Sequence, residues 1–239
     1  MTRLVHLISA MLAIAAASTP SWAAGTEPAP AEPAAESAPK TADTSDSVPP
    51  YDWSLRAKDA YLATYKEACA SFEPDDKIED RKPDIYDLKF RYASDEADMP
   101  DRVVTLYRFF CNRGAYNETH VFFMRTDAPD IVPVAFAEPA LHTRYENEDS
   151  EGKLLGVDII GWRASSMLVN SEVDPAKNTV TSFSKWRGVG DASSSGVWIL
   201  KEGAFVLSTY DVDASYDGEI NPQTISDFRA ANETLNETP

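Results

Sequence analysis

Apolar residues change their spacing once along this chain, and that change limits the folds open to it. In the earlier segment they recur every three or four residues, at Tyr61, Leu62, Tyr65, Ala68, Cys69 and Phe72. This is the spacing of one helix face, and Ser54 is a candidate cap. From Leu88 onward apolar and charged residues alternate instead, which is typical of a half-buried strand. We therefore expect one helix followed by β-structure.

Further strands are predicted where short apolar or β-branched runs are bounded by turn residues. These runs lie at 103–111, 119–125, 132–137, 154–162, 167–170, 179–183, 197–200 and 204–210. The last two flank a short turn in which Gly203 is free to take a positive φ, so they predict a hairpin. Asn221 and Pro222 are typical of a helix start and predict a short helix from Pro222. The expected fold class is α+β: a β-rich single domain with antiparallel sheets, an N-terminal helix and a short C-terminal helix.

Residues 1–23 are typical of a removable export signal. Arg3 precedes an apolar stretch too short to span a bilayer, and Ser21-Trp22-Ala23 forms a small-x-small cleavage site. Residues 24–50 are mostly Ala, Pro, Glu, Ser, Thr and Asp, which predicts a disordered tether. We expect the globular domain at 51–228 and a C-terminal tail at 229–239. The predicted location is periplasmic or secreted, with no membrane span.

Charge restricts the partners of this chain. It has 22 Lys and Arg against 39 Asp and Glu, a formal net charge of −17. So acidic a surface repels phosphate backbones, so nucleic acid is not an expected partner. The same charge serves solubility, or steers the protein toward a cationic protein, peptide or metal ion.

The chain has two cysteines, Cys69 and Cys111. Export delivers both to an oxidising compartment, so we expect them to form a structural disulfide. Closing that loop stabilises the fold by about 4 kcal/mol on the chain-entropy model. Two free thiols are the alternative, but no C-x-x-C spacing or neighbouring histidine favours redox catalysis.

The sequence predicts no catalytic residue and no cofactor. His120 and His142 remain after signal removal, and neither has a partner at ligand spacing. The serines at 193–195 are expected in a flexible loop, with no base placed to activate them. Carboxylates are so numerous that a hydrolase using Asp or Glu residues stays open as an alternative, without assigned residues.

Asp213, Ser215 and Asp217 place oxygen atoms at alternate positions before a glycine, like the start of a calcium-binding EF-hand loop. The twelfth position of such a loop needs a bidentate glutamate, and here it holds Thr224. A turn after the hairpin is therefore the main prediction. A weak calcium site is the alternative, and no other metal site is predicted.

Two blocks together resemble an exported bacterial family known as domain of unknown function 1176 (DUF1176). Residues 111–117 are similar to its C-x-x-G-A-Y-N segment, and residues 183–191 with the Trp198 hairpin are similar to its K-x-R-G-x-G-D-C and W-x-x-x-G-x-F-x-L pattern. The family pattern has cysteines where this chain has Ala192 and Tyr216. The resemblance therefore implies a lost second disulfide and a freer loop at 191–195, and it implies no activity.

Arg187 and Asp191 flank the glycines of the second block, where they can pair across a tight turn or contact a ligand. With Tyr116 and Asn117 of the first block they are the candidate binding residues. We expect an exported, non-enzymatic binding or interaction module, whose partner is an unknown envelope protein or a peptidoglycan-associated component. The alternatives are the hydrolase above and an inhibitor of a cationic wall-degrading enzyme, which charge alone suggests.

Overall fold

The computed structural model describes residues 52–70, 75–126, 130–150 and 152–234. The chain divides into two units, Met1–Ser47 and Val48–Pro239, and the described residues all belong to the second. The predicted export signal and tether lie outside them. Within the described ranges, no helix is long and apolar enough to cross a membrane.

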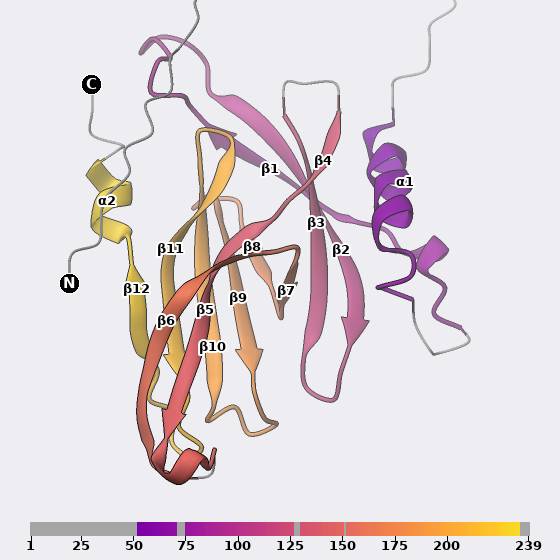
Figure 1. Cartoon of the computed structure of the whole chain (residues 1–239). Helices are drawn as coiled ribbons and strands as arrows, with labels where there is room; N and C mark the ends of the chain where they lie inside the picture. The colour runs from indigo at the N-terminus through magenta and orange to yellow at the C-terminus, as the bar shows by residue number, and fades with distance from the viewer. Residues whose placement is uncertain (1–51, 71–74, 127–129, 151, 235–239) are drawn as a thin grey trace, which may run out of the picture. The chain divides into compact units, whose positions relative to one another are not determined.

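The described elements are mostly antiparallel strands, which confirms the predicted fold class (Figure 1). In chain order they are α1 (Trp53–Tyr65), η1 (Ile78–Asp80), β1 (Asp84–Phe90), β2 (Arg102–Arg113), β3 (Glu118–Arg125), β4 (Ile131–Pro133), β5 (Phe136–Tyr145), η2 (Glu146–Glu148), β6 (Leu154–Ser165), β7 (Met167–Val169), β8 (Glu172–Asp174), β9 (Thr179–Lys185), β10 (Ser193–Lys201), β11 (Ala204–Asp213), β12 (Gln223–Asp227) and α2 (Arg229–Thr234).

The strands form two larger sheets and a two-stranded ribbon. The first sheet has the order β1-β2-β3-β4, with β7 also paired to β3. The second has the order β12-β11-β10-β9-β8, and β5 pairs with β6 in the ribbon. We call them the β1–β4 sheet, the β8–β12 sheet and the β5–β6 ribbon.

The central strands β2 and β3 are buried on both faces. Leu106 and Phe122 join the main core, which also holds apolar side chains of the β8–β12 sheet. Residues of the opposite parity, such as Phe109 and Phe123, pack with α1 in a second cluster. Since successive side chains of a strand point to opposite faces, burial on both sides explains why these segments read as continuous apolar runs.

Helix α1 begins earlier than the sequence pattern indicates. The Asp52 carboxylate caps it by accepting from the backbone N–H groups of Ser54 and Leu55 at 2.9 and 3.2 Å, so Ser54 is not the cap. The helix ends at Tyr65, and Cys69 follows in a turn, fully buried. Tyr61 stacks on Phe109, with ring centroids 4.4 Å apart.

The C-terminal helix exists, but its predicted start at Pro222 is wrong. Residues Gln223–Asp227 form β12, which pairs with the edge of β11 opposite β10. Helix α2 follows at Arg229–Thr234, in the segment expected to be a tail. Pairing with an available strand edge outweighs the local Asn-Pro signal, because only the strand satisfies the backbone groups of β11.

The predicted hairpin at 197–210 is confirmed as β10 and β11. Lys201 pairs with Ala204 across a two-residue loop. Glu202 and Gly203 both take positive φ, 47° and 80°, as the tight turn that matches strand twist requires.

The β5–β6 ribbon contains two bulges. Pairing shifts between Ala140 and Leu141, which leaves Ile160 of β6 without an opposite residue, and a second shift does the same for Leu155. Both side chains are exposed, at 70% and 55%. The bulges bend the ribbon so that other β6 residues, Leu154 and Val157, pack on the main core.

Candidate functional site

The four candidate binding residues predicted from sequence lie together at the end of the domain where three loops meet. Tyr116 and Asn117 belong to the β2–β3 turn, and Arg187 and Asp191 belong to the β9–β10 loop. The third loop, between β11 and β12, contacts Arg187 and Asp191 through Tyr216 and Gly218.

Tyr116 and Asn117 hold the end of β9 against the β2–β3 turn. The Tyr116 hydroxyl donates to the Trp186 carbonyl at 3.3 Å. The Asn117 amide donates to the Lys185 carbonyl at 2.8 Å, and its oxygen accepts from the Lys185 N–H at 3.2 Å. Asn170 adds a further donor to the same amide oxygen at 2.8 Å. These contacts tie the two larger sheets together across this end.

Arg187 and Asp191 pair across the glycine turn. Of the two alternatives given for these residues, pairing across the turn or contact with a ligand, the structure has the first. Arg187 Nε donates to Asp191 Oδ1 at 2.6 Å, and its Nη2 donates to Oδ2 and to the Tyr216 carbonyl. The Gly218 N–H donates to Asp191 Oδ2 at 2.9 Å. These donors hold the pKa of Asp191 down at about 2, the Arg187 hydrogen bond being the largest cause. The carboxylate is therefore used to fasten two loops.

The loop at 191–195 is ordered by these contacts. Ser193–Ser195 form the start of β10, paired with both β9 and β11, so the predicted flexible loop is wrong. Ala192 is fully buried, and its carbonyl accepts from the Trp186 N–H at 2.8 Å. The Arg187–Asp191–Gly218 contacts join the segments that carry Ala192 and Tyr216, where the family resemblance implies a lost disulfide.

In the segment proposed as a weak calcium site, the Asp213 and Asp217 carboxylates already accept hydrogen bonds from neighbouring residues. Asp213 is 2% exposed. Its Oδ1 accepts from the Ser215 N–H and hydroxyl, and its Oδ2 accepts from the Asn221 N–H at 2.7 Å. Asp217 accepts from the Glu219 N–H. Within the described ranges, no group of three or more His, Cys, Asp or Glu side chains is placed to hold a metal ion.

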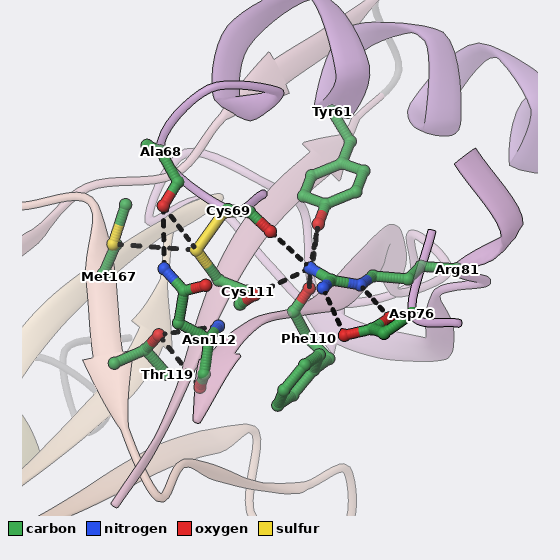
Figure 2. Close-up of a disulfide and its surroundings, with 10 residues drawn as sticks. All are labelled: Tyr61, Ala68, Cys69, Asp76, Arg81, Phe110, Cys111, Asn112, Thr119 and Met167. Atoms are coloured by element: carbon green, nitrogen blue, oxygen red, sulfur yellow. Dashed lines mark hydrogen bonds and ion pairs between the residues drawn. A yellow bond between two sulfur atoms is a disulfide. The ribbon is translucent and has the colours of Figure 1, made fainter. Parts of the chain in front are cut away.

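The predicted disulfide between Cys69 and Cys111 is present (Figure 2). Beneath it lies Arg81, which is 9% exposed. Its Nη1 donates to the carbonyls of Cys69 and Cys111 at 2.8 and 2.7 Å, and to the Tyr61 hydroxyl at 3.1 Å. Asp76 forms the matching ion pair at 2.8 Å.

A cavity of about 1190 Å³ lies beside the disulfide. Arg81 and Asp76 line it, but their charged groups already bind each other and, for Arg81, backbone carbonyls. Arg113 at the rim is paired with Glu118 at 2.7 Å. The charged groups of Arg81, Asp76 and Arg113 therefore serve the fold.

A second cavity, of about 470 Å³, lies between the β5–β6 ribbon and the β8–β12 sheet. Its volume falls within the range of about 300–1,000 Å³ that is usual for small-ligand sites. It is lined by Glu138, Pro139, Leu141, Thr143, Arg163, Ser165, Met167, Val169, Ser182, Ser184, Trp186, Ser194 and Tyr210.

The wall formed by β9 and β10 changes from apolar to polar along one face. Cross-strand pairs on this face run from Val180–Trp198 through Ser182–Gly196 to Ser184–Ser194. Val180 and Trp198 are fully buried in the main core, whereas Ser182 and Ser194, also buried, line the cavity. Hydroxyl groups thus occupy positions where the same face would otherwise continue the core.

The opposite wall contributes a buried carboxylate. Glu138 of β5 is 7% exposed, and its Oε2 accepts from Arg163 Nε and Nη2 at 3.1 and 2.9 Å. The Arg163 side chain is 65% exposed, so the cavity opens to solvent at Arg163. Burial raises the pKa of the Tyr210 hydroxyl, against a smaller lowering by Ser194. Tyr210 therefore stays protonated at neutral pH and can donate a hydrogen bond.

Trp186 links this cavity to the residues predicted from sequence. Its backbone is held by Tyr116 and by Ala192, and its Nε1 donates to the Ser194 hydroxyl at 3.3 Å. The same side chain lines the cavity. Tyr116, Asn117, Arg187 and Asp191 are not among the lining residues of this cavity, so they position one of its walls.

Sequence reasoning missed the cavity residues. Strand β9 did carry a signal, because Val180, Ser182 and Ser184 alternate with Thr179, Thr181 and Phe183 and so place serines on the same face as a core valine. Glu138 and Arg163 gave none, since they are 25 positions apart and their pairing depends on the register of β5 and β6, which contains two shifts.

Comparison with known proteins gives one match. No curated protein and no solved structure matches the chain. The family model described as "Protein of unknown function (DUF1176)" matches residues 17–220. That match covers most of the chain, including both motif blocks and the cavity. The chain therefore belongs to the DUF1176 family.

Proposed function

We propose that this protein is an exported, non-enzymatic binding module whose ligand site is the cavity between the β5–β6 ribbon and the β8–β12 sheet. The observation that carries the proposal is the row of hydroxyl groups on the interior face of β9 and β10. Burying polar groups costs free energy that an apolar core would save. A concave surface with a few convergent polar groups is what a ligand site needs.

Export is supported by residues 1–23 and by the Cys69–Cys111 disulfide, which suits an oxidising compartment. In that compartment the ligand would be an envelope component, and the cavity volume suits a small molecule or one end of a larger one. A peptidoglycan-associated component remains the proposed source.

Binding is favoured over hydrolysis by the charges in the cavity. Hydrolysis by paired carboxylates needs two acidic groups about 5–10 Å apart around one bond. Glu138 is the one carboxylate among the residues that line the cavity, and Arg163 binds it. The lining thus supplies groups that orient a ligand.

The proposal is tested by filling the cavity. Wild-type protein and a Ser184→Leu variant are heated with neutral sugars, amino acids, nucleosides and soluble peptidoglycan fragments, and unfolding is followed by circular dichroism. A ligand present at a hundred times its Kd stabilises the wild type by about 2.7 kcal/mol. We expect Ser184→Leu to abolish that stabilisation.

Ser195→Leu is the matched control, because Ser195 lies on β10 with its side chain on the other face from Ser194. This variant should keep the response of the wild type. Equal stabilisation of wild type and Ser184→Leu by every active compound would refute the cavity as the site.

A further inference from the structure

We infer that the ligand of the cavity is an uncharged, short saccharide or the saccharide end of a glycan. The inference rests on the proposed function, since it assigns a chemical class to the same site. It follows from three properties of the lining: its charge balance, its hydrogen-bonding groups and its apolar surface.

The charge balance favours a neutral ligand. Glu138 and Arg163 are the two charged residues of the lining, and they form an ion pair at 2.9 Å. A phosphate or carboxylate ligand would need a cation that is not already neutralised. A cationic ligand would compete with Arg163 for the same carboxylate. The net charge of −17 further disfavours an anion.

The hydrogen-bonding groups match a molecule rich in hydroxyls. Serine, threonine and tyrosine hydroxyls both donate and accept, as sugar hydroxyls do. Ser182, Ser184, Thr143 and Tyr210 supply these groups from both walls. Ser194 already accepts from Trp186 and Ser165 already donates to the Met167 carbonyl, so Ser194 can still donate to a ligand and Ser165 can still accept. Both bonds from Arg163 go to Glu138 Oε2, and the other oxygen can accept from a sugar hydroxyl in a charge-assisted bond.

The apolar surface matches the C–H face of a sugar ring. Trp186 lines the cavity with Leu141 and Met167. The hydrogen bond from Trp186 Nε1 to Ser194 fixes the direction of the indole, and the Tyr116 and Ala192 contacts fix its backbone. An aromatic side chain held in one orientation presents its apolar surface at low entropic cost. Amino acids and nucleosides would not use this surface and the hydroxyl rows together as fully.

The test is isothermal titration calorimetry of the full chain with defined probes. Glucose, N-acetylglucosamine and the β-1,4-linked disaccharides of each are compared with the two 6-phosphates, alanine and uridine. We expect a neutral sugar to bind, and its 6-phosphate to bind at least tenfold more weakly. Glu138→Gln should weaken sugar binding about tenfold to hundredfold, and Ser184→Ala about fivefold.

Asp158→Asn is the matched control for Glu138→Gln. Asp158 pairs with Arg144 across the same ribbon at 2.7 Å, with both side chains about half exposed and outside the cavity lining. This variant should bind the sugar within twofold of the wild type. Circular dichroism of every variant establishes that the fold is kept, and Ser184→Ala serves if Glu138→Gln unfolds.

The outcomes separate the inference from the proposed function. Tighter binding of a 6-phosphate, of alanine or of uridine, lost in Ser184→Leu, would overturn the saccharide class and leave the cavity as the site. Sugar binding unchanged by Glu138→Gln and Ser184→Ala would overturn the inference, and sugar binding unchanged by Ser184→Leu would overturn both. Failure of all the neutral sugars to bind would overturn the saccharide class.

Discussion

Removing the disulfide gives the sharpest test of how this domain is stabilised. The perturbation is the double substitution Cys69→Ala with Cys111→Ala. The bond joins residues 42 positions apart, and the chain-entropy model gives about 4 kcal/mol for a loop of that length. Domains are commonly stable by about 5–15 kcal/mol. The variant should therefore lose a large part of its free energy of unfolding and remain folded.

The structure indicates why the folded state should survive. Arg81 donates to the carbonyls of both Cys69 and Cys111, and these bonds do not need the sulfur atoms. Tyr61 also donates to the Phe110 carbonyl at 2.9 Å. The helix and β2 thus stay joined in the native state. The loss should fall mainly on the unfolded chain, which becomes less restricted.

The measurement is urea unfolding at equilibrium, followed by tryptophan fluorescence and circular dichroism. The free energy of unfolding should fall by about 4 kcal/mol, and the m-value should rise because the unfolded chain exposes more surface. Wild-type protein unfolded with a thiol reductant should give the same values. A loss below about 1 kcal/mol with an unchanged m-value would refute the loop-closure reasoning.

Two further predictions concern Gly196 and Asp191. A Cβ at Gly196 would lie 2.8 and 2.9 Å from Cζ3 and Cζ2 of the buried Trp198 ring, so Gly196→Ala should lower the free energy of unfolding in urea by about 1–3 kcal/mol. A Cβ at Gly161 would meet nothing within 4 Å, so Gly161→Ala is the control and should not cause this loss. Equal losses in the two variants would contradict the steric argument. The pKa of Asp191 is lowered from 3.8 to about 2, so its contribution is present above pH 4 and lost as pH falls toward 2. Asp191→Asn should reduce the pH dependence of stability in that interval, and an unchanged pH profile would count against the Arg187 pairing.

The fold could be predicted where apolar residues mark the buried side of an element. Helix α1 and β1 were found because their apolar residues keep one spacing, and β2 and β3 because they form continuous apolar runs. Strand β5 was found only at its start, because Glu138 and Pro139 interrupt the apolar pattern. Those residues face the cavity or solvent, so the strand is set by its pairing with β6.

The candidate site was predictable only in part. The Arg187–Asp191 pair spans four residues around glycines, and local sequence was enough to propose it. The Arg187–Asp191 pair lies next to Tyr116, Asn117 and the β11–β12 loop because of the way the two larger sheets pack. Sheet packing cannot be predicted from a local sequence pattern. The cavity draws its walls from six strands, β5, β6, β7, β9, β10 and β11, so its polar character emerges only once they are assembled.

The two bulges of β6 have a consequence for how copies of this protein behave toward each other. Among the described residues, β6 pairs on one side with β5, which leaves its other side as a sheet edge. Such an edge, with Ile160 and Leu155 exposed, would ordinarily invite a second chain to add a strand. Each bulge breaks the even spacing of donors and acceptors, so an added strand could not stay in register for more than a few residues. The irregular ribbon therefore protects the domain against aggregation at a strand edge that carries two exposed aliphatic side chains.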